Sequence, residues 1–270
     1  MGIEFQGVGK TYPDGTVAVA DFSCTVPSHC TLALVGSSGS GKTTLMRMVN
    51  RMVEPTAGTV LIDDIDVRQR DRVDLRRSIG YVPQAGGLLP HRRVVDNVAT
   101  VPVLTGTPKR KARDDAIGLL ELVGLDPALA RRYPGQLSGG QQQRVAVARA
   151  LAADPNILLM DEPFGAVDPI VRRDLQDQLL ELQQRLGKTI LLVTHDVDEA
   201  FRLGDQVVLL KTGGVVAQAG TPEQIMASPA DDFVRDFIGA SRAERALRTV
   251  DVDGRRVVVD GHGKPLGVMD

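Results

Sequence analysis

The stretch Gly36-Ser37-Ser38-Gly39-Ser40-Gly41-Lys42-Thr43 decides the fold class of this chain. It follows the short aliphatic run Thr31 to Val35, and apolar side chains then recur with helical spacing from Leu45 to Met52. A glycine-rich turn between a strand and an amphipathic helix is typical of a phosphate-binding loop, whose backbone amides curl around a phosphate chain. We expect Lys42 to reach the β- and γ-phosphate oxygens and Thr43 to hold Mg²⁺.

Other segments have the same alternation of strand and helix. The runs Ile157 to Met160, Thr189 to Val193 and Val207 to Leu210 predict strands that are buried on both faces. Apolar residues from Val171 to Leu186 predict a helix between two of them. We therefore expect an α/β core with a mostly parallel sheet. The segment before Thr31 and the stretch 59–67 favour β structure.

Two regions differ from this core. The segment from about Pro90 to Leu151 is rich in Arg and Ala with helical spacing, which predicts a helical subdomain. After Pro222 the pattern is helical to about Arg248. A hairpin is then expected around Asp253-Gly254.

Composition excludes several classes of function. The 270 residues include 32 Lys and Arg against 34 Asp and Glu, so a basic nucleic-acid-binding domain is not indicated. Aromatic residues make up only 3% and Trp is absent, which disfavours a stacking platform for single-stranded nucleic acid. Cys24 and Cys30 match no metal-ligand spacing and are interpreted as small core hydrophobes in a reducing compartment. No apolar run approaches the ~18 residues of a membrane span and no signal peptide is recognisable, so we expect a soluble cytosolic protein, or one bound to a membrane through a partner.

A pair of acids follows the predicted strand at Ile157 to Met160. Asp161 stands at the end of this strand, where a carboxylate can bind the water shell of Mg²⁺. Glu162 comes next and is expected to orient or polarise the attacking water.

The third element is Leu137-Ser138-Gly139-Gly140-Gln141, followed by a predicted helix. Ser138 and the two glycine amides at a helix start form a second anion site. One chain would then own two half-sites for a phosphate chain, which suggests a dimer. Here the sequence resembles the ATP-binding cassette family, the ATPase subunits of ABC transporters, from about Ile3 to Gly239.

The resemblance implies an architecture and a partner arrangement. The fold would be a RecA-like phosphate-loop core with an N-terminal antiparallel β subdomain and a helical subdomain at about 90–151. Residues 1–239 would form the ATPase domain and residues 240–270 a short tail. Two such subunits would pair head to tail, with ATP between one phosphate loop and the partner's Ser138 to Gln141. Hydrolysis of ATP to ADP and phosphate would make the chain an enzyme.

Four further residues match landmarks of the family. Tyr12 stands where the family stacks an aromatic ring on adenine, and Gln84 matches the glutamine that contacts the metal and the attacking water. Asp168 matches the acid at the dimer interface, and His195 matches the histidine that touches the γ-phosphate. The resemblance thus implies Glu162, His195 and Gln84 as catalytic residues, and Thr43, Gln84 and Asp161 as metal ligands. The residues implied for ATP are Tyr12, Gly36, Ser37, Ser38, Gly39, Ser40, Gly41, Lys42, Thr43, Thr44, Ser138, Gly139, Gly140, Gln141 and Asp168.

A finer resemblance concerns the transported solute. The stretches 48–58, 87–91, 97–102 and 232–239 resemble those of the glycine betaine, choline and carnitine import ATPases. This implies a complex with a membrane permease and an extracytoplasmic binding protein, at the cytoplasmic face of the membrane. ATPases of this group often continue into two CBS domains, which need on the order of a hundred residues, whereas only residues 240–270 follow here. The end of the chain resembles one CBS hairpin, or is a plain C-terminal hairpin.

Three alternatives remain at this point. An ATPase for amino acids or another small solute would show the same motifs. A cassette ATPase acting on DNA or ribosomes is disfavoured, because the stretch from Lys42 to Ser138 holds no coiled coil and the chain has one cassette. A catalytically dead nucleotide-binding regulator is disfavoured by Lys42, Asp161, Glu162 and His195.

Overall fold

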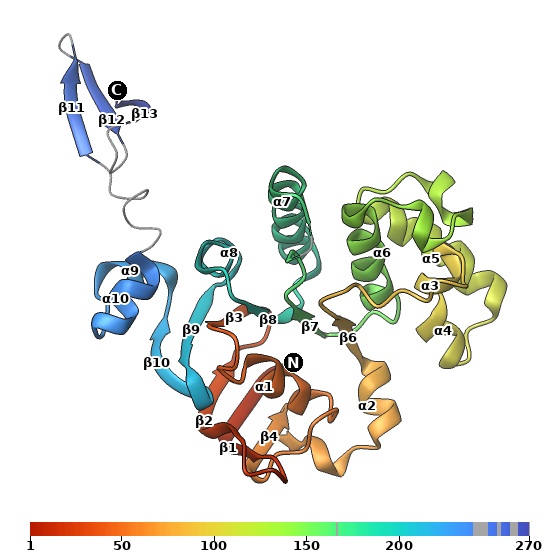
Figure 1. The fold of residues 1–270 in the computed structure, drawn as a ribbon. Helices are drawn as coiled ribbons and strands as arrows, with labels where there is room; N and C mark the ends of the chain where they lie inside the picture. Colours follow the sequence, from red (N-terminus) through yellow and green to blue (C-terminus); the bar gives the residue numbers. More distant parts are fainter. Residues whose placement is uncertain (166, 240–247, 253–254, 260–263, 270) are drawn as a thin grey trace.

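The central feature of the fold is a six-stranded sheet that carries helices on both sides (Figure 1). The structure is a computed structural model that describes residues 1–165, 167–239, 248–252, 255–259 and 264–269. The strand order is β10-β9-β3-β8-β7-β6, and only β10 runs antiparallel to its neighbour. The bounds are β3 Thr31–Gly36, β6 Ile79–Val82, β7 Ile157–Asp161, β8 Thr189–Thr194, β9 Gln206–Lys211 and β10 Val215–Gly220. The expected α/β core is confirmed.

Side-chain alternation along β3 divides the core into two layers. Leu32 and Leu34 point into a cluster that the N-terminal strands and helix α1 (Lys42–Val49) complete. Ala33 and Val35 point into a second cluster that contains residues of α7 (Pro169–Leu186), α8 (Val197–Leu203) and α10 (Asp232–Gly239). Every residue of β3 is buried, as expected for a strand covered on both faces.

Helix α1 is shorter than its apolar spacing predicted. Leu45, Met48 and Val49 are buried as expected, but Met52 lies beyond the end of the helix and is exposed. The chain leaves the helix because Asn50 caps it and Arg51 takes a left-handed conformation with φ 54°.

The segment before the phosphate loop belongs to a second, antiparallel sheet of order β2-β1-β4-β5. Its strands are β1 Ile3–Thr11, β2 Val17–Val26, β4 Ala57–Ile62 and β5 Ile65–Asp66. Phe5 and Phe22 meet edge to face at 5.3 Å between ring centroids and belong to the same core cluster as α1. Cys24 packs against this cluster, and burial raises the pKa of its thiol to about 11. Cys30 is only partly buried and belongs to none of the core clusters, so its expected place in the core is wrong.

Residues 90–151, all of which are described, contain helices and no strand. They form α3 Val94–Val98, α4 Thr100–Leu104, α5 Lys109–Leu122 and α6 Gly139–Leu151, with 3₁₀ turns at Pro127–Arg131 and Pro134–Gln136. A third core cluster, which includes Val94, Leu120 and Val145, holds α3, α5 and α6 together. Helix α2 (Arg72–Ser78) leads into β6 on the way to this region.

The chain beyond β10 forms α9 (Pro222–Ala227), α10 and a separate three-stranded sheet. Strands β11 (Arg248–Val252) and β12 (Arg255–Val259) pair antiparallel, as the expected hairpin requires, and β13 (Pro265–Met269) pairs with β12. The turn residues 253–254 and the end of the expected helix at 240–247 lie outside the described residues, and Arg248 begins a strand. No described helix combines the length and the apolar character that crossing a membrane requires.

Gly58 tests how tightly β1 and β4 approach each other. Gly58 and Gly15 both have positive φ (71° and 85°), so alanine at either position carries the same left-handed strain of about 1 kcal/mol. A Cβ at Gly58 would also lie 2.2 Å from the carbonyl oxygen of Gly7, whereas one at Gly15 meets nothing within 4 Å. We expect Gly58→Ala to lower the free energy of unfolding by about 2 kcal/mol more than Gly15→Ala in urea titrations. Equal losses would show that the two backbones separate freely.

Candidate functional site

The phosphate loop links the end of β3 to the start of α1. Gly36 must be glycine because a Cβ there would lie 2.4 Å from the carbonyl oxygen of Leu210 on β9. Gly39 and Gly41 take positive φ of 79° and 87°, which only glycine adopts without strain. Ser37, Ser38 and Gly39 are exposed at the rim of the loop, so its amides are accessible to a ligand.

The side chain of Lys42 lies beneath this loop with only 5% of the residue exposed. Its ammonium donates to the carbonyl oxygens of Gly36 and Ser37, both at 2.8 Å, and to the Ser40 hydroxyl at 3.3 Å. Burial lowers the pKa of Lys42, while the nearby Glu162 and Asp161 carboxylates act in the opposite direction. The charge is therefore held where a phosphate oxygen would meet it.

Oxygen ligands suited to Mg²⁺ gather beside Lys42. Asp161 ends β7 with 3% of the residue exposed, and its Oδ1 accepts a hydrogen bond of 2.9 Å from the Thr43 hydroxyl. The Tyr81 hydroxyl donates to Oδ2 at 3.4 Å, and the Arg47 guanidinium lies 3.7 Å from the same oxygen. A carboxylate and a hydroxyl are ligands that Mg²⁺ prefers, so these residues fit the ion chemically.

Glu162 is the meeting point of three segments that are remote in sequence. Its Oε2 accepts from Gln84 Nε2 at 3.0 Å and lies 3.2 Å from His195 Nδ1. Glu162 adopts a left-handed φ of 45°, and its amide donates to Val193 of β8 at 2.8 Å. Such strain in a residue other than glycine is characteristic of functional sites. Gln84, Glu162 and His195 follow β6, β7 and β8, so the parallel strands deliver them to one edge.

The segment predicted as the second half-site begins helix α6. Ser138 caps α6: its hydroxyl accepts from the Gln141 amide at 3.3 Å, and the Gln141 side chain accepts from the Ser138 amide at 3.0 Å. Helix α6 packs against α3, α5, α7 and β6, whereas α1 packs against β2, β3, β4, β7 and β8. Helix α6, which Ser138 caps, thus packs on a different part of the fold from α1, and Figure 1 shows the two helices apart.

Two further predicted site residues, Tyr12 and Asp168, lie next to the ends of β1 and α7. Tyr12 follows β1 with 37% of the residue exposed, and the Lys10 ammonium lies 5.2 Å from its ring centroid. The ring is available for stacking. Asp168 precedes α7, and its carbonyl oxygen accepts from the Arg172 amide at 2.8 Å.

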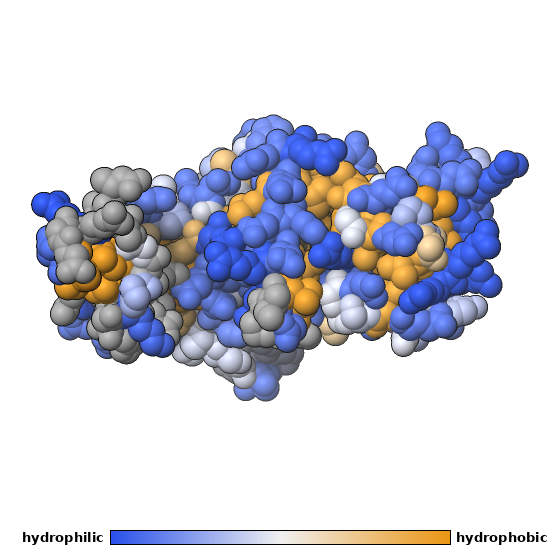
Figure 2. Space-filling model, turned by 90° about the horizontal axis from the view of Figure 1, so that it is seen from above, coloured by the Kyte–Doolittle hydropathy of each residue, from blue (hydrophilic) through white to orange (hydrophobic). Residues whose placement is uncertain are grey.

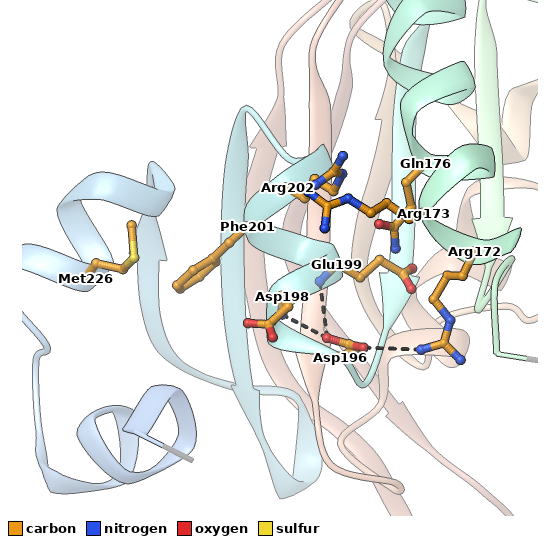
Figure 3. A pocket seen from close by; sticks show the side chains of 9 residues that line it. All are labelled: Arg172, Arg173, Gln176, Asp196, Asp198, Glu199, Phe201, Arg202 and Met226. Atoms are coloured by element: carbon orange, nitrogen blue, oxygen red, sulfur yellow. Dashed lines mark hydrogen bonds and ion pairs between the residues drawn. The ribbon is translucent and has the colours of Figure 1, made fainter. Parts of the chain in front are cut away.

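The motifs did not reveal a cavity between α7 and α8 that is lined mostly by charged residues. It has a volume of about 650 Å³ and is lined by Arg172, Arg173, Gln176, Asp196, Asp198, Glu199, Phe201, Arg202 and Met226 (Figure 3). Glu199 is 4% exposed, and burial, with a smaller contribution from Asp196, raises the pKa of its carboxyl to about 8. In the sequence, Glu199 stands four residues after His195, near the start of α8. This spacing is the feature by which the sequence could have drawn attention to Glu199.

Comparisons with known proteins agree with one another. Residues 19–165, more than half of the chain, match the family model described as ABC transporter. The choline transport ATP-binding protein of Bacillus subtilis (strain 168) is 47% identical over 94% of this chain and 66% of its own length. The glycine betaine uptake system ATP-binding protein of Escherichia coli (strain K12) is 47% identical over 88% of this chain and 77% of its own. A solved dimer of the ATP-binding cassette MJ0796, in a post-hydrolysis state bound to ADP and Pi, is 33% identical with a TM-score of 0.74, covering 82% of this chain and 98% of its own.

Several of the relatives are longer proteins. The chain spans 66% of the length of the choline transport protein and 60% of that of two carnitine transport proteins from Listeria monocytogenes.

The buried Glu199 gives stability a specific pH dependence. Its pKa is raised on folding from the ordinary value of 4.5 to about 8, so the folded state holds a proton that the unfolded state has lost between these pH values. The contribution is complete below about pH 4.5 and disappears as pH rises to 8, with a slope of up to about 1 kcal/mol per pH unit. We expect Glu199→Gln to raise the melting temperature relative to wild type at pH 8.5 and to change it little at pH 5. A parallel shift at both pH values would contradict a protonated Glu199.

Proposed function

Because the chain belongs to the ABC transporter family, we propose that it is the ATP-hydrolysing subunit of an importer of quaternary amine osmoprotectants such as glycine betaine, choline and carnitine. The convergence of Gln84, Glu162 and His195 beside Lys42 and the Thr43–Asp161 pair carries the ATPase part of this proposal. The likeness to the choline and glycine betaine transport proteins supports the solute class. This arrangement provides a phosphate cradle, oxygen ligands for a metal and a carboxylate base within one edge of a sheet.

Phosphate binding follows from the hydrogen bonds of Lys42. The ammonium exchanges its loop acceptors for β- and γ-phosphate oxygens, while the amides of Gly36–Thr43 and the side chain of Thr44 surround the phosphates. Tyr12 stacks on the adenine ring. Thr43, Asp161 and Gln84 would hold Mg²⁺, which when bound neutralises charge on the β- and γ-phosphates.

Hydrolysis requires a positioned water beside the γ-phosphate. The Glu162 carboxylate orients this water and receives a proton from it, while Gln84 and His195 hold the carboxylate and face the γ-phosphate. A bond forms between the water oxygen and the γ-phosphorus. The bond from phosphorus to the β,γ-bridging oxygen breaks, and ADP departs with that electron pair.

A head-to-tail pair of subunits completes the site. Ser138–Gln141 and Asp168 of one subunit would meet the nucleotide held by the other; for Ser138–Gln141 this agrees with the separate packing of α6 and α1. The likeness to a dimeric cassette supports this arrangement. Loss of the γ-phosphate removes the anion that bridges the two half-sites, and the pair reopens.

The helical region offers a surface for a permease at the cytoplasmic face of the membrane. Val103, Leu104, Ile117 and Tyr133 are large apolar side chains that are exposed in this region. Figure 2 shows apolar surface between hydrophilic residues over the helical part of the molecule, at the right of the view. Exposed apolar surface of this kind is suited to protein contact.

We assign the ATPase domain to residues 1–239 and a tail, resembling one CBS hairpin, to residues 240–270.

Substitution of Glu162 separates nucleotide binding from hydrolysis. We expect Glu162→Gln to bind ATP with wild-type affinity, to reduce turnover by at least about a hundredfold, and to prolong the ATP-bound dimer. Phosphate release and size-exclusion chromatography with ATP measure these effects. Lys42→Ala is the contrasting variant, because loss of the cradle charge should abolish nucleotide binding itself. Unchanged turnover in Glu162→Gln would remove this carboxylate from the mechanism.

Uptake by intact cells tests the solute. Cells lacking this chain, but expressing its permease, should accumulate labelled glycine betaine or choline when wild type is restored and fail to do so with Glu162→Gln. Proline uptake serves as the comparison. Wild-type ATP hydrolysis without uptake of any quaternary amine would refute the substrate and leave the ATPase assignment intact, with amino acids the next class to test.

A further inference from the structure

The first turn of α7 lies between the two half-sites of the chain. Val167 and Asp168 lead directly into α7, and Val171 and Arg172 follow on its first turn. On one side, Gly140 of the Ser138–Gln141 segment is so close that a Cβ there would lie 2.6 Å from Val171 Cγ1. On the other side α7 packs against α8, the helix that begins two residues after His195.

Arg172 carries this contact to α8. Its Nη2 donates to the Val167 carbonyl oxygen at 3.4 Å, and its Nη1 lies 3.6 Å from Asp196 Oδ2. Figure 3 shows the guanidinium pointing from α7 toward Asp196. One side chain therefore links the backbone before α7 to the residue that follows His195.

Asp196 determines how the chain leaves His195. Its Oδ1 caps α8 by accepting from the Asp198 and Glu199 amides at 2.8 and 3.2 Å, and its own amide donates to the Thr194 hydroxyl at 3.0 Å. His195 lies between these anchored residues, and its ring contacts Glu162. A shift of Asp196 is thus transmitted to the imidazole.

A second carboxyl, that of Glu199, lines the same cavity as this guanidinium. Glu199 lines the cavity beside Arg172, and Glu199 Oε1 and Arg172 Nε are both buried without a hydrogen-bond partner among the described residues. With a pKa of about 8, Glu199 is mostly protonated at pH 7 and carries little charge. Asp196 is therefore the carboxylate that pairs with Arg172. The pairing seen in the structure is therefore the one that charge favours at neutral pH.

We propose that Arg172 is a positioning residue that couples the half-site formed by Ser138–Gln141 and Asp168 to His195, through Val167 on one side and Asp196 on the other. This inference rests on the proposed function, because it assumes that His195 faces the γ-phosphate. When a partner subunit seats the segment before α7, Arg172 holds Asp196 in place and His195 reaches its working position. Hydrolysis then depends on pairing as well as on bound nucleotide.

The test is a double-mutant cycle with the full 270-residue chain at pH 7. Arg172→Met removes the guanidinium, and Asp196→Asn removes the charge while keeping a side chain that caps helices well. We expect each variant to lower kcat about tenfold, with KM and nucleotide affinity within about twofold of wild type, because only positioning is lost. The double variant should be no slower than the slower single variant.

Arg202→Met is the matched control. Arg202 lines the same cavity but forms an ion pair with Asp177 instead of Asp196, so its kcat should equal that of wild type. A merely structural role for Arg172 would lower the melting temperature without separating kcat from KM. If Arg172→Met fails to fold, Asp196→Asn and Arg172→Lys carry the test. Arg172→Lys, which keeps the positive charge, should then have a kcat between that of Asp196→Asn and that of wild type.

Each outcome decides a separate question. Multiplicative losses in the double variant, or wild-type kcat in both single variants, would overturn the coupling while leaving the ATPase assignment in place. Absence of nucleotide binding and hydrolysis in wild type itself would instead refute the proposed function.

Discussion

The burial of one positive charge constrains the whole site. The Lys42 ammonium is nearly inaccessible and lies close to two carboxylates, so it must be fully hydrogen-bonded. Its acceptors are carbonyl and hydroxyl oxygens of the loop itself, which holds the loop curled around the charge. That curl depends on Gly36, because any larger residue would push β3 from β9. The fold thus holds the Lys42 ammonium against neutral oxygen acceptors of the loop. The charged oxygens of a phosphate chain can take the place of these acceptors.

The parallel sheet then assembles partners that sequence keeps far apart. Asp161 meets Thr43, and Glu162 meets Gln84 and His195, because strands β3, β6, β7 and β8 all end at the same edge. These strands are buried on both faces and in register, so little freedom remains at their ends. The strained φ of Glu162 is tolerated because its amide is anchored to Val193.

The local motifs predicted the parts of the site whose geometry is local. The phosphate loop, the acids at the end of β7 and the cap at Ser138 each occupy the position that the sequence indicated. Met52 is exposed and does not lie on the buried face of α1, because the left-handed conformation of Arg51 follows the end of the helix. The spacing of apolar residues does not predict this early end. The contacts of Tyr81 and Arg47 with Asp161 depend on how strands and helices pack. So does the protonation of Glu199, because its cause is burial.

The two proposed half-sites lie on different elements, and coupling between them needs a rigid connection. Helix α7 meets this need because its first turn contacts Gly140 on one side while its length packs into the core beside α8. A purely apolar contact between α7 and α8 would not fix the position of one particular side chain, because apolar packing is not directional. An ion pair that ends on a helix-capping carboxylate is directional, and Arg172–Asp196 supplies one next to His195. A single exposed ion pair contributes little to the free energy of unfolding. This does not argue against the proposed role, because the pair selects a geometry and need not stabilise the fold.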